Sequence, residues 1–151
     1  MQKLINLIQR KAFEPQRLIL EFNERGFCKN TEIALKSLYK LKKSGVKLAL
    51  DDYASGVSSF NFLHSYPFEF IKLDRGFIKS LKYDDKNLPL VKALQYLGDK
   101  FGYRLVAEGI ECEEVMKKLH AVGCDFGQGY HISKPEKLLC KSIDEAGKSC
   151  A

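Results

Sequence analysis

The sequence predicts an α/β fold in which strand–helix units repeat around a parallel sheet. Short apolar runs typical of strands alternate with segments whose apolar residues have helical spacing, which indicates repeated βα units. The run 47–50, bounded by Gly45 and by Ser55-Gly56, has the length and apolarity of a buried parallel strand. No linker rich in proline or glycine divides the chain, so we expect one folding unit.

The first half of the chain predicts two helices and two strands. Residues 2–12 have helical apolar spacing, and a proline shortly after them stops any helix. The run 18–24 is a predicted strand with acidic residues at its end. The next helix begins at the capping pair Asn30-Thr31 and ends at Gly45. The strand that follows it ends in Asp51-Asp52.

The second half repeats this pattern. The predicted elements are a short helix at 58–64, a strand at 68–74, a helix at 87–101, a strand at 103–107, a helix at 113–122, a weaker strand at 125–130 and a polar helix at 136–149. Within the helix at 87–101 we expect the apolar side chains to face the core, namely Leu90, Val91, Leu94, Leu97 and Phe101.

Polar residues occupy the carboxyl ends of all five predicted strands, or positions close to them. These residues are Glu21, Asp51, Lys72, Glu108 and Gln128. In (β/α)₈ barrels the carboxyl ends of the strands form the rim that carries the chemistry. One charged strand end has no significance by itself, but five of them in successive units predict a shared site at that rim.

The adjacent carboxylates Asp51 and Asp52 have two interpretations. Carboxylates at the tip of a strand can hold Mg²⁺ or Mn²⁺ for phosphoryl chemistry. A solvated pair that starts a turn or caps the next helix explains this stretch equally well. Lys72 likewise suits a catalytic role or a partly buried ion pair with Asp74 or Asp52.

The other strand-end residues also have ordinary structural explanations. Glu21 and Glu24 are compatible with a polar strand end that runs into a surface turn. Glu108 could begin a helix, where acidic residues favour the helix dipole. Gln128 lies between two glycines, as in many turns.

The composition restricts the function classes. The formal net charge is +6, but the lysines lack a basic stripe with interleaved aromatic residues, so we expect no DNA or RNA binding. Nothing approaches the ~20 uninterrupted apolar residues of a membrane span, so no membrane segment is predicted. The 5 cysteines form no CxxC pair, and without an export signal they predict reduced thiols in a cytoplasmic protein.

Several motifs resemble those of the EAL-family cyclic di-GMP phosphodiesterase domain. Glu21-Phe22-Asn23-Glu24 is similar to the family's Glu-x-Thr-Glu motif, with Asn23 in place of the usual threonine. The segment 51–56 resembles the Asp-Asp-Phe-Gly-Thr-Gly loop. The segments 71–74, 107–111 and 128–130 resemble three further motifs in the same order and spacing, and the resemblance extends from about Pro15 to Pro135.

The resemblance implies a role for each strand-end residue. The implied metal ligands are Glu21, Asp51, Asp52 and Glu108, the implied catalytic residues are Glu108 and Lys72, the implied substrate-binding residues are Gln128 and Asp74, and the implied anchor of the loop after Asp52 is Glu24. The implied cofactor is Mg²⁺ or Mn²⁺ in a two-metal site. Hard oxygen ligands of this kind suit either cation.

The resemblance also implies a partial (β/α)₈ TIM-type barrel with about five of the eight βα units. We expect units 4–8 of the domain within residues 1–139, and a C-terminal helix end or tail at 140–151. The Glu-Ala-Leu motif and the strand with the family's metal-binding asparagine are absent. The sheet should therefore be open, with edges at the first and last strands.

The loop after Asp52 departs from the family pattern. Tyr53-Ala54 replaces Phe-Gly, and alanine resists the positive φ angles that glycine adopts. Val57 also replaces the family's tyrosine. We expect these substitutions to affect how well the loop is ordered, the contacts of a dimer and the geometry of the metal site.

The expected function is that of a portion of a cyclic di-GMP-specific phosphodiesterase domain, which when complete hydrolyses its substrate to linear pGpG. We expect weak or no hydrolysis by this chain alone, because two metal ligands are missing. One alternative is a degenerate module that binds cyclic di-GMP or a protein partner without catalysis. Another is a truncated product that persists only by pairing. Expected partners are cyclic di-GMP and a second copy or the upstream part of the domain.

Overall fold

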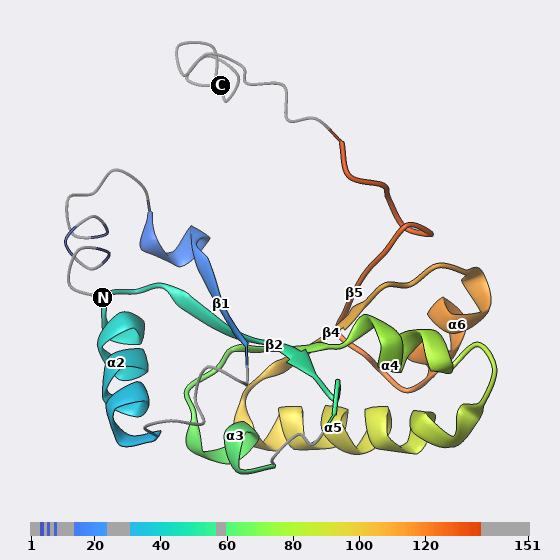
Figure 1. Ribbon diagram of the computed structural model, residues 1–151, viewed down its shortest axis with the longest axis horizontal. Helices are drawn as coiled ribbons and strands as arrows, with labels where there is room; N and C mark the ends of the chain where they lie inside the picture. Colours follow the sequence, from blue (N-terminus) through green and yellow to red (C-terminus); the bar gives the residue numbers. More distant parts are fainter. Residues whose placement is uncertain are drawn as a thin grey trace.

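Five parallel strands form one sheet in the order β1-β2-β3-β4-β5, so each strand lies beside its neighbours in the sequence (Figure 1). The computed structural model describes residues 4, 6, 8, 14–23, 31–56 and 60–136. The strands are β1 (Ile19–Asn23), β2 (Lys47–Tyr53), β3 (Phe70–Leu73), β4 (Arg104–Glu108) and β5 (Phe126–Gln128). Parallel neighbours require a crossover connection between them, so this order confirms the predicted βα units.

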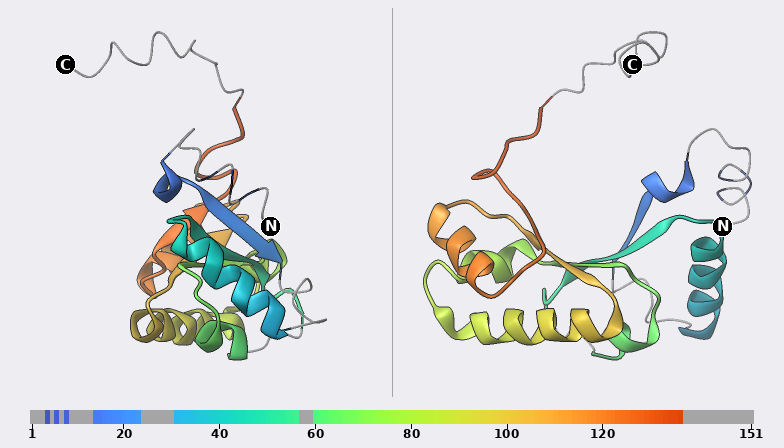
Figure 2. Two further views of the ribbon diagram at one scale, coloured as in Figure 1. Left: turned by 90° about the vertical axis from the view of Figure 1, so that its left-hand side faces the viewer. Right: turned by 180° about the vertical axis from the view of Figure 1, so that it is seen from behind.

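The short helix η1 (Pro15–Arg17) precedes β1, and the other helical segments lie in these crossovers. They are α2 (Thr31–Lys43), α3 (Phe60–Ser65), α4 (Arg75–Ser80), η3 (Asp85–Asn87), α5 (Leu88–Phe101) and α6 (Glu113–Ala121). The longest of them, α5, runs along one face of the sheet, and α3 lies beside its end (Figure 1 and Figure 2). Every helix in the described ranges is too short or too polar to serve as a membrane-spanning segment.

The sheet is open, as predicted, with β1 and β5 at its edges. Ile19 on β1 and Phe126 on β5 are exposed large apolar side chains at these edges. An edge strand presents backbone N–H and C=O groups that a further strand can pair with. The open sheet therefore offers two places where additional strands could join.

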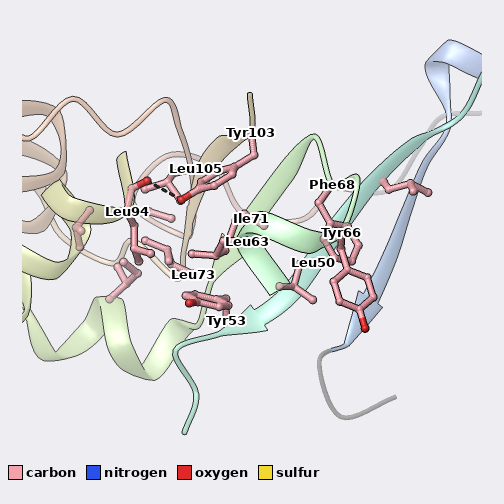
Figure 3. Close-up of a cluster of buried hydrophobic side chains, with 14 of the residues drawn as sticks. Leu50, Tyr53, Leu63, Tyr66, Phe68, Ile71, Leu73, Leu94, Tyr103 and Leu105 are labelled. Atoms are coloured by element: carbon pink, nitrogen blue, oxygen red, sulfur yellow. Dashed lines mark hydrogen bonds between the residues drawn. The ribbon is translucent and has the colours of Figure 1, made fainter. Parts of the chain in front are cut away.

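The hydrophobic core lies between the sheet and its helices, with buried side chains from α2, α4, α5 and α6, and Figure 3 shows part of it. Leu50, Ile71 and Leu105 are register partners on adjacent strands and are fully buried. Their side chains share one face because parallel partners in register point the same way. On α5, Leu94 packs into this cluster. The Tyr103 hydroxyl donates a hydrogen bond to the Leu94 carbonyl oxygen at 2.8 Å.

Two of the core predictions for the helix at 87–101 are wrong. Leu90 is 36% exposed and Phe101 is 47% exposed, whereas Val91 and Leu94 are buried as predicted. Leu90 and Phe101 lie in the first and last turns of α5, outside the stretch from Val91 to Gly98 that contains its buried residues. Helical periodicity identifies the apolar face but not how far along the helix that face is covered.

The helix α4 was not expected from the sequence. The predicted strand at 68–74 is shorter than expected, and Asp74 caps this additional helix through a hydrogen bond from the Phe77 backbone N–H at 3.0 Å. The predicted strand at 125–130 is likewise reduced to the three residues of β5. Of the predicted helix at 2–12, residues 4, 6 and 8 are described and are helical. Residues 137–151 lie outside the described residues, and with them lie the predicted polar helix at 136–149, apart from its first residue, and the predicted domain end at 139.

Tyr103→Phe should lower the free energy of unfolding by about 1 kcal/mol, because the variant lacks the donor to the buried Leu94 carbonyl. Burial also raises the pKa of the Tyr103 phenol, so the hydroxyl stays protonated and keeps this donor. Urea denaturation followed by circular dichroism measures the change. Tyr96→Phe is the matched control because Tyr96 is exposed on α5, the helix that carries Leu94. Equal effects of the two substitutions would contradict the assignment.

Candidate metal centre and active site

An irregularity in β2 brings two adjacent carboxylates to one rim. The pairing with β3 shifts between Leu50 and Tyr53, where Asp51 and Asp52 together lie opposite Lys72. In a regular strand, successive side chains point to opposite faces of the sheet. A bulge with two residues opposite one redirects the side chains locally. Asp52 has the positive φ of 55° that accompanies this change of direction.

The remaining site residues reach this rim through regular register. Glu21 on β1 lies opposite Ala49, and Glu108 on β4 lies opposite Gln128 on β5. Glu21, Lys72 and Gln128 line a hollow of about 420 Å³ in the face of the sheet opposite the core. The carboxyl ends of the strands therefore bring the predicted side chains together from all five strands.

Lys72 is the centre of this cluster. Its ammonium Nζ lies 2.9 Å from Glu21 Oε2, 3.0 Å from Asp51 Oδ1 and 2.7 Å from Glu108 Oε1. Burial lowers the pKa of Lys72, but the carboxylates around the ammonium together raise the pKa by more than burial lowers it. The net pKa therefore lies above the ordinary value for lysine. Lys72 thus carries a positive charge throughout the physiological pH range.

Three carboxylates form a candidate cation site beside this lysine. Oxygens of Asp51, Asp52 and Glu108 lie within 4.8 Å of one another. Asp51 Oδ1 is shielded from solvent and contacts the Lys72 ammonium as an ion pair, and no donor in the described part of the chain reaches it with hydrogen-bond geometry. A hard divalent cation prefers oxygen ligands of this kind. The residues therefore fit Mg²⁺ or Mn²⁺.

Asn23 is a contact of the site that the sequence did not reveal. Its side-chain Nδ2 donates a hydrogen bond to Asp52 Oδ2 at 2.6 Å. The sequence showed only that Asn23 occupies a position where the family has threonine. A neutral amide orients the Asp52 carboxylate without cancelling its charge. Because side-chain contacts between strands depend on tertiary register, no local signal could have identified this one.

Gln128 borders a second hollow next to Glu108. This pocket, of about 350 Å³, is also lined by Arg75, Tyr130 and Lys134. Its wall contains cationic, aromatic and amide groups, which suit an anionic ligand with a ring. The turn after Glu108 is held by Gly109, at φ 72°, where an added Cβ would collide with the Arg75 side chain.

Two predicted site residues, Asp74 and Glu24, make no described contact with the cluster around Lys72. The Asp74 carboxylate accepts the capping hydrogen bond from the Phe77 N–H, so its substrate-binding role stays a prediction. Glu24 lies outside the described residues, and its role as loop anchor also stays a prediction.

Comparisons with known proteins agree with this arrangement. The EAL domain family matches residues 1–135. The cyclic di-GMP phosphodiesterase PdeA of Borreliella burgdorferi is 34% identical over 123 residues, which cover 82% of this chain and 18% of PdeA. The PaMucR phosphodiesterase in complex with c-di-GMP has a TM-score of 0.81 at 33% identity, covering 91% of this chain and 56% of that one. A manganese and cyclic di-GMP complex of Klebsiella pneumoniae BlrP1 has a TM-score of 0.77 at 25% identity, covering 85% and 33%.

The sheet order and the acidic rim define a TIM-barrel-like α/β domain with a candidate site for divalent cations. The chain belongs to the EAL domain family. It spans less than a fifth of the length of PdeA and just over half of the PaMucR chain. The resemblance inferred from the motifs, and the partial barrel that it implied, are thereby confirmed.

Ala54→Gly should raise the free energy of unfolding by about 0.5–1 kcal/mol. Ala54 has a φ of 69°, a conformation that costs an L-residue roughly 1–2 kcal/mol. Glycine relieves this strain, but the greater conformational entropy of glycine in the unfolded chain cancels part of the gain. Urea denaturation is the measurement. Ala34→Gly, within the helix α2, is the matched control and should have the opposite sign. Destabilisation by both substitutions would contradict strain at Ala54.

Proposed function

We propose that this chain is part of an EAL domain that hydrolyses cyclic di-GMP to linear pGpG. The observation that carries the proposal is the convergence of Asp51, Asp52 and Glu108 beside the Lys72 ammonium. The relatives support it, since PdeA is a cyclic di-GMP phosphodiesterase and BlrP1 has been solved with manganese and cyclic di-GMP.

The carboxylates that would hold Mg²⁺ or Mn²⁺ are Glu21, Asp51, Asp52 and Glu108. Such cations, when bound, lower the pKa of a water molecule and neutralise charge on a phosphodiester. Glu108, whose side chain is less exposed than those of Glu21 and Asp51, accepts the proton of the attacking water. Lys72 places its positive charge where the phosphate oxygens gain negative charge. Gln128 offers its amide to the ligand from the wall of the adjacent pocket.

A receptor without catalysis is the second candidate. The observation that favours it is the backbone after Asp52, where Ala54 occupies a positive φ that the family fills with glycine. A strained loop at this position could leave the cation ligands displaced while the neighbouring pocket still binds the nucleotide. Binding and turnover must therefore be measured separately.

The partners and the location are further parts of the proposal. The open edges β1 and β5 support completion of the barrel, either by the upstream part of the domain or by a second copy. Cys112 and Cys124 are free thiols among the described residues, which supports a location in the reducing cytoplasm.

The test is an assay of the 151-residue chain with cyclic di-GMP and Mn²⁺, in which chromatography measures pGpG and calorimetry measures binding. We expect binding that depends on the cation and turnover that is slow at most. Glu108→Gln should reduce any turnover by about 100-fold or more, because the proton acceptor is lost. It should also weaken the cation-dependent part of nucleotide binding, because Glu108 is one of the candidate cation ligands.

Glu113→Gln is the matched control, since Glu113 is exposed on α6 and pairs only with Lys117 among the ion pairs of the described residues. Turnover unaffected by Glu108→Gln would refute the catalytic assignment. Binding without turnover in the parent chain would favour the receptor. A chain that neither binds nor cleaves the nucleotide would refute both candidates.

A further inference from the structure

Lys72 is the only buried charged residue in the described part of the chain, with 9% of its surface exposed. Burying an ammonium is unfavourable unless opposite charges compensate for its lost hydration. Glu21, Asp51 and Glu108 supply that compensation within 3.0 Å of Nζ. In the absence of other cations, Lys72 is thus the positive charge that keeps these carboxylates together.

The partners of Lys72 overlap with the candidate cation site. Asp51 and Glu108 belong both to the ion-pair cluster and to the three carboxylates whose oxygens lie within 4.8 Å of one another. Asp52 is the third member, and its described side-chain partner is the neutral Asn23 amide. A cation that binds this triad must therefore share two ligands with the ammonium.

The charge balance gives this overlap a direction. Four carboxylates, namely Glu21 with the triad, carry four negative charges against the one positive charge of Lys72, so the cluster has a formal charge of −3. Such a cluster attracts a divalent cation, but a fixed ammonium among the ligands repels the cation at short range.

We propose that Lys72 is an internal counter-ion that competes with a divalent cation for Asp51 and Glu108. This inference depends on the cation site of the proposed function. Binding of the cation withdraws those two carboxylates from the ammonium. The released positive charge is then available at the same rim for an anionic ligand, so cation binding and ligand binding support each other.

The alternative is that Lys72 only positions the ligands. The two roles predict opposite signs when the ammonium is removed. Loss of a positioning residue loosens the ligands and weakens cation binding. Loss of a competing charge strengthens cation binding, because the carboxylates then lack any internal cation.

The experiment is a Mn²⁺ titration of the full chain, in which electron paramagnetic resonance measures free Mn²⁺. We expect Lys72→Met to bind Mn²⁺ on the order of tenfold more tightly than the parent chain, since the short-range repulsion is gone. Lys72→Arg retains the charge and should stay close to the parent affinity. Lys92→Met, an exposed position on α5, controls for the change in net charge.

The outcomes separate this proposal from the one on which it depends. Equal or weaker binding by Lys72→Met, with the parent chain still binding Mn²⁺, would overturn the competition and leave the cation site standing. Tighter binding by Lys92→Met to the same degree would also overturn it. Failure of every variant to bind Mn²⁺ would overturn the cation site and the competition together.

A measurement on the unmodified chain covers the case in which Lys72→Met does not fold. Nuclear magnetic resonance of the lysine ammonium groups can follow Lys72 Nζ during a titration with diamagnetic Mg²⁺. We expect the Lys72 signal to shift or broaden along with the signals of Asp51 and Glu108. A Lys72 signal that stays constant while those of the carboxylates change would overturn the proposal.

Discussion

The pairing of one buried ammonium with three carboxylates is the constraint on which the carboxyl rim of the sheet depends. Lys72 lies on β3, and its partners Glu21, Asp51 and Glu108 come from β1, β2 and β4. A shift of any of these strands by one residue would turn a carboxylate to the other face and leave the buried charge poorly compensated. The same ion pairs therefore select the register of the sheet and assemble the site.

The apolar face of the sheet makes this polar cluster possible. Leu50, Ile71 and Leu105 are buried against the helical layer. The next residue along each strand points to the opposite face, and these residues are Asp51, Lys72 and Val106. Burial of these side chains supplies the favourable free energy that holds the strands together. The alternation of the strands thus lets a stable core on one face coexist with an open second face whose charged residues gather at the carboxyl rim.

Much of the fold and the site could be predicted because both depend on short-range patterns. Apolar runs between helical stretches indicated the parallel sheet, and polar strand ends such as Lys72 and Glu108 indicated the rim. Other features were beyond such patterns. Three of them depend on how separate segments pack, namely the bulge at Asp51-Asp52, the hydrogen bond from Asn23 to Asp52 and the exposure of Leu90. The helix α4 was not predicted, although Asp74, the residue that caps its N-terminus, is of a type that commonly caps helices.

By itself the sequence determined the parallel βα architecture, the family and the identity of the residues at the strand ends, because periodicity and motif spacing are local properties of the chain. Tertiary structure alone decided that Lys72 lies among three carboxylates instead of pairing with Asp74 or Asp52, as the sequence had left open. Partners of a buried charge are chosen by strand register and by a two-against-one bulge. Those are relations between strands that no single stretch of sequence contains.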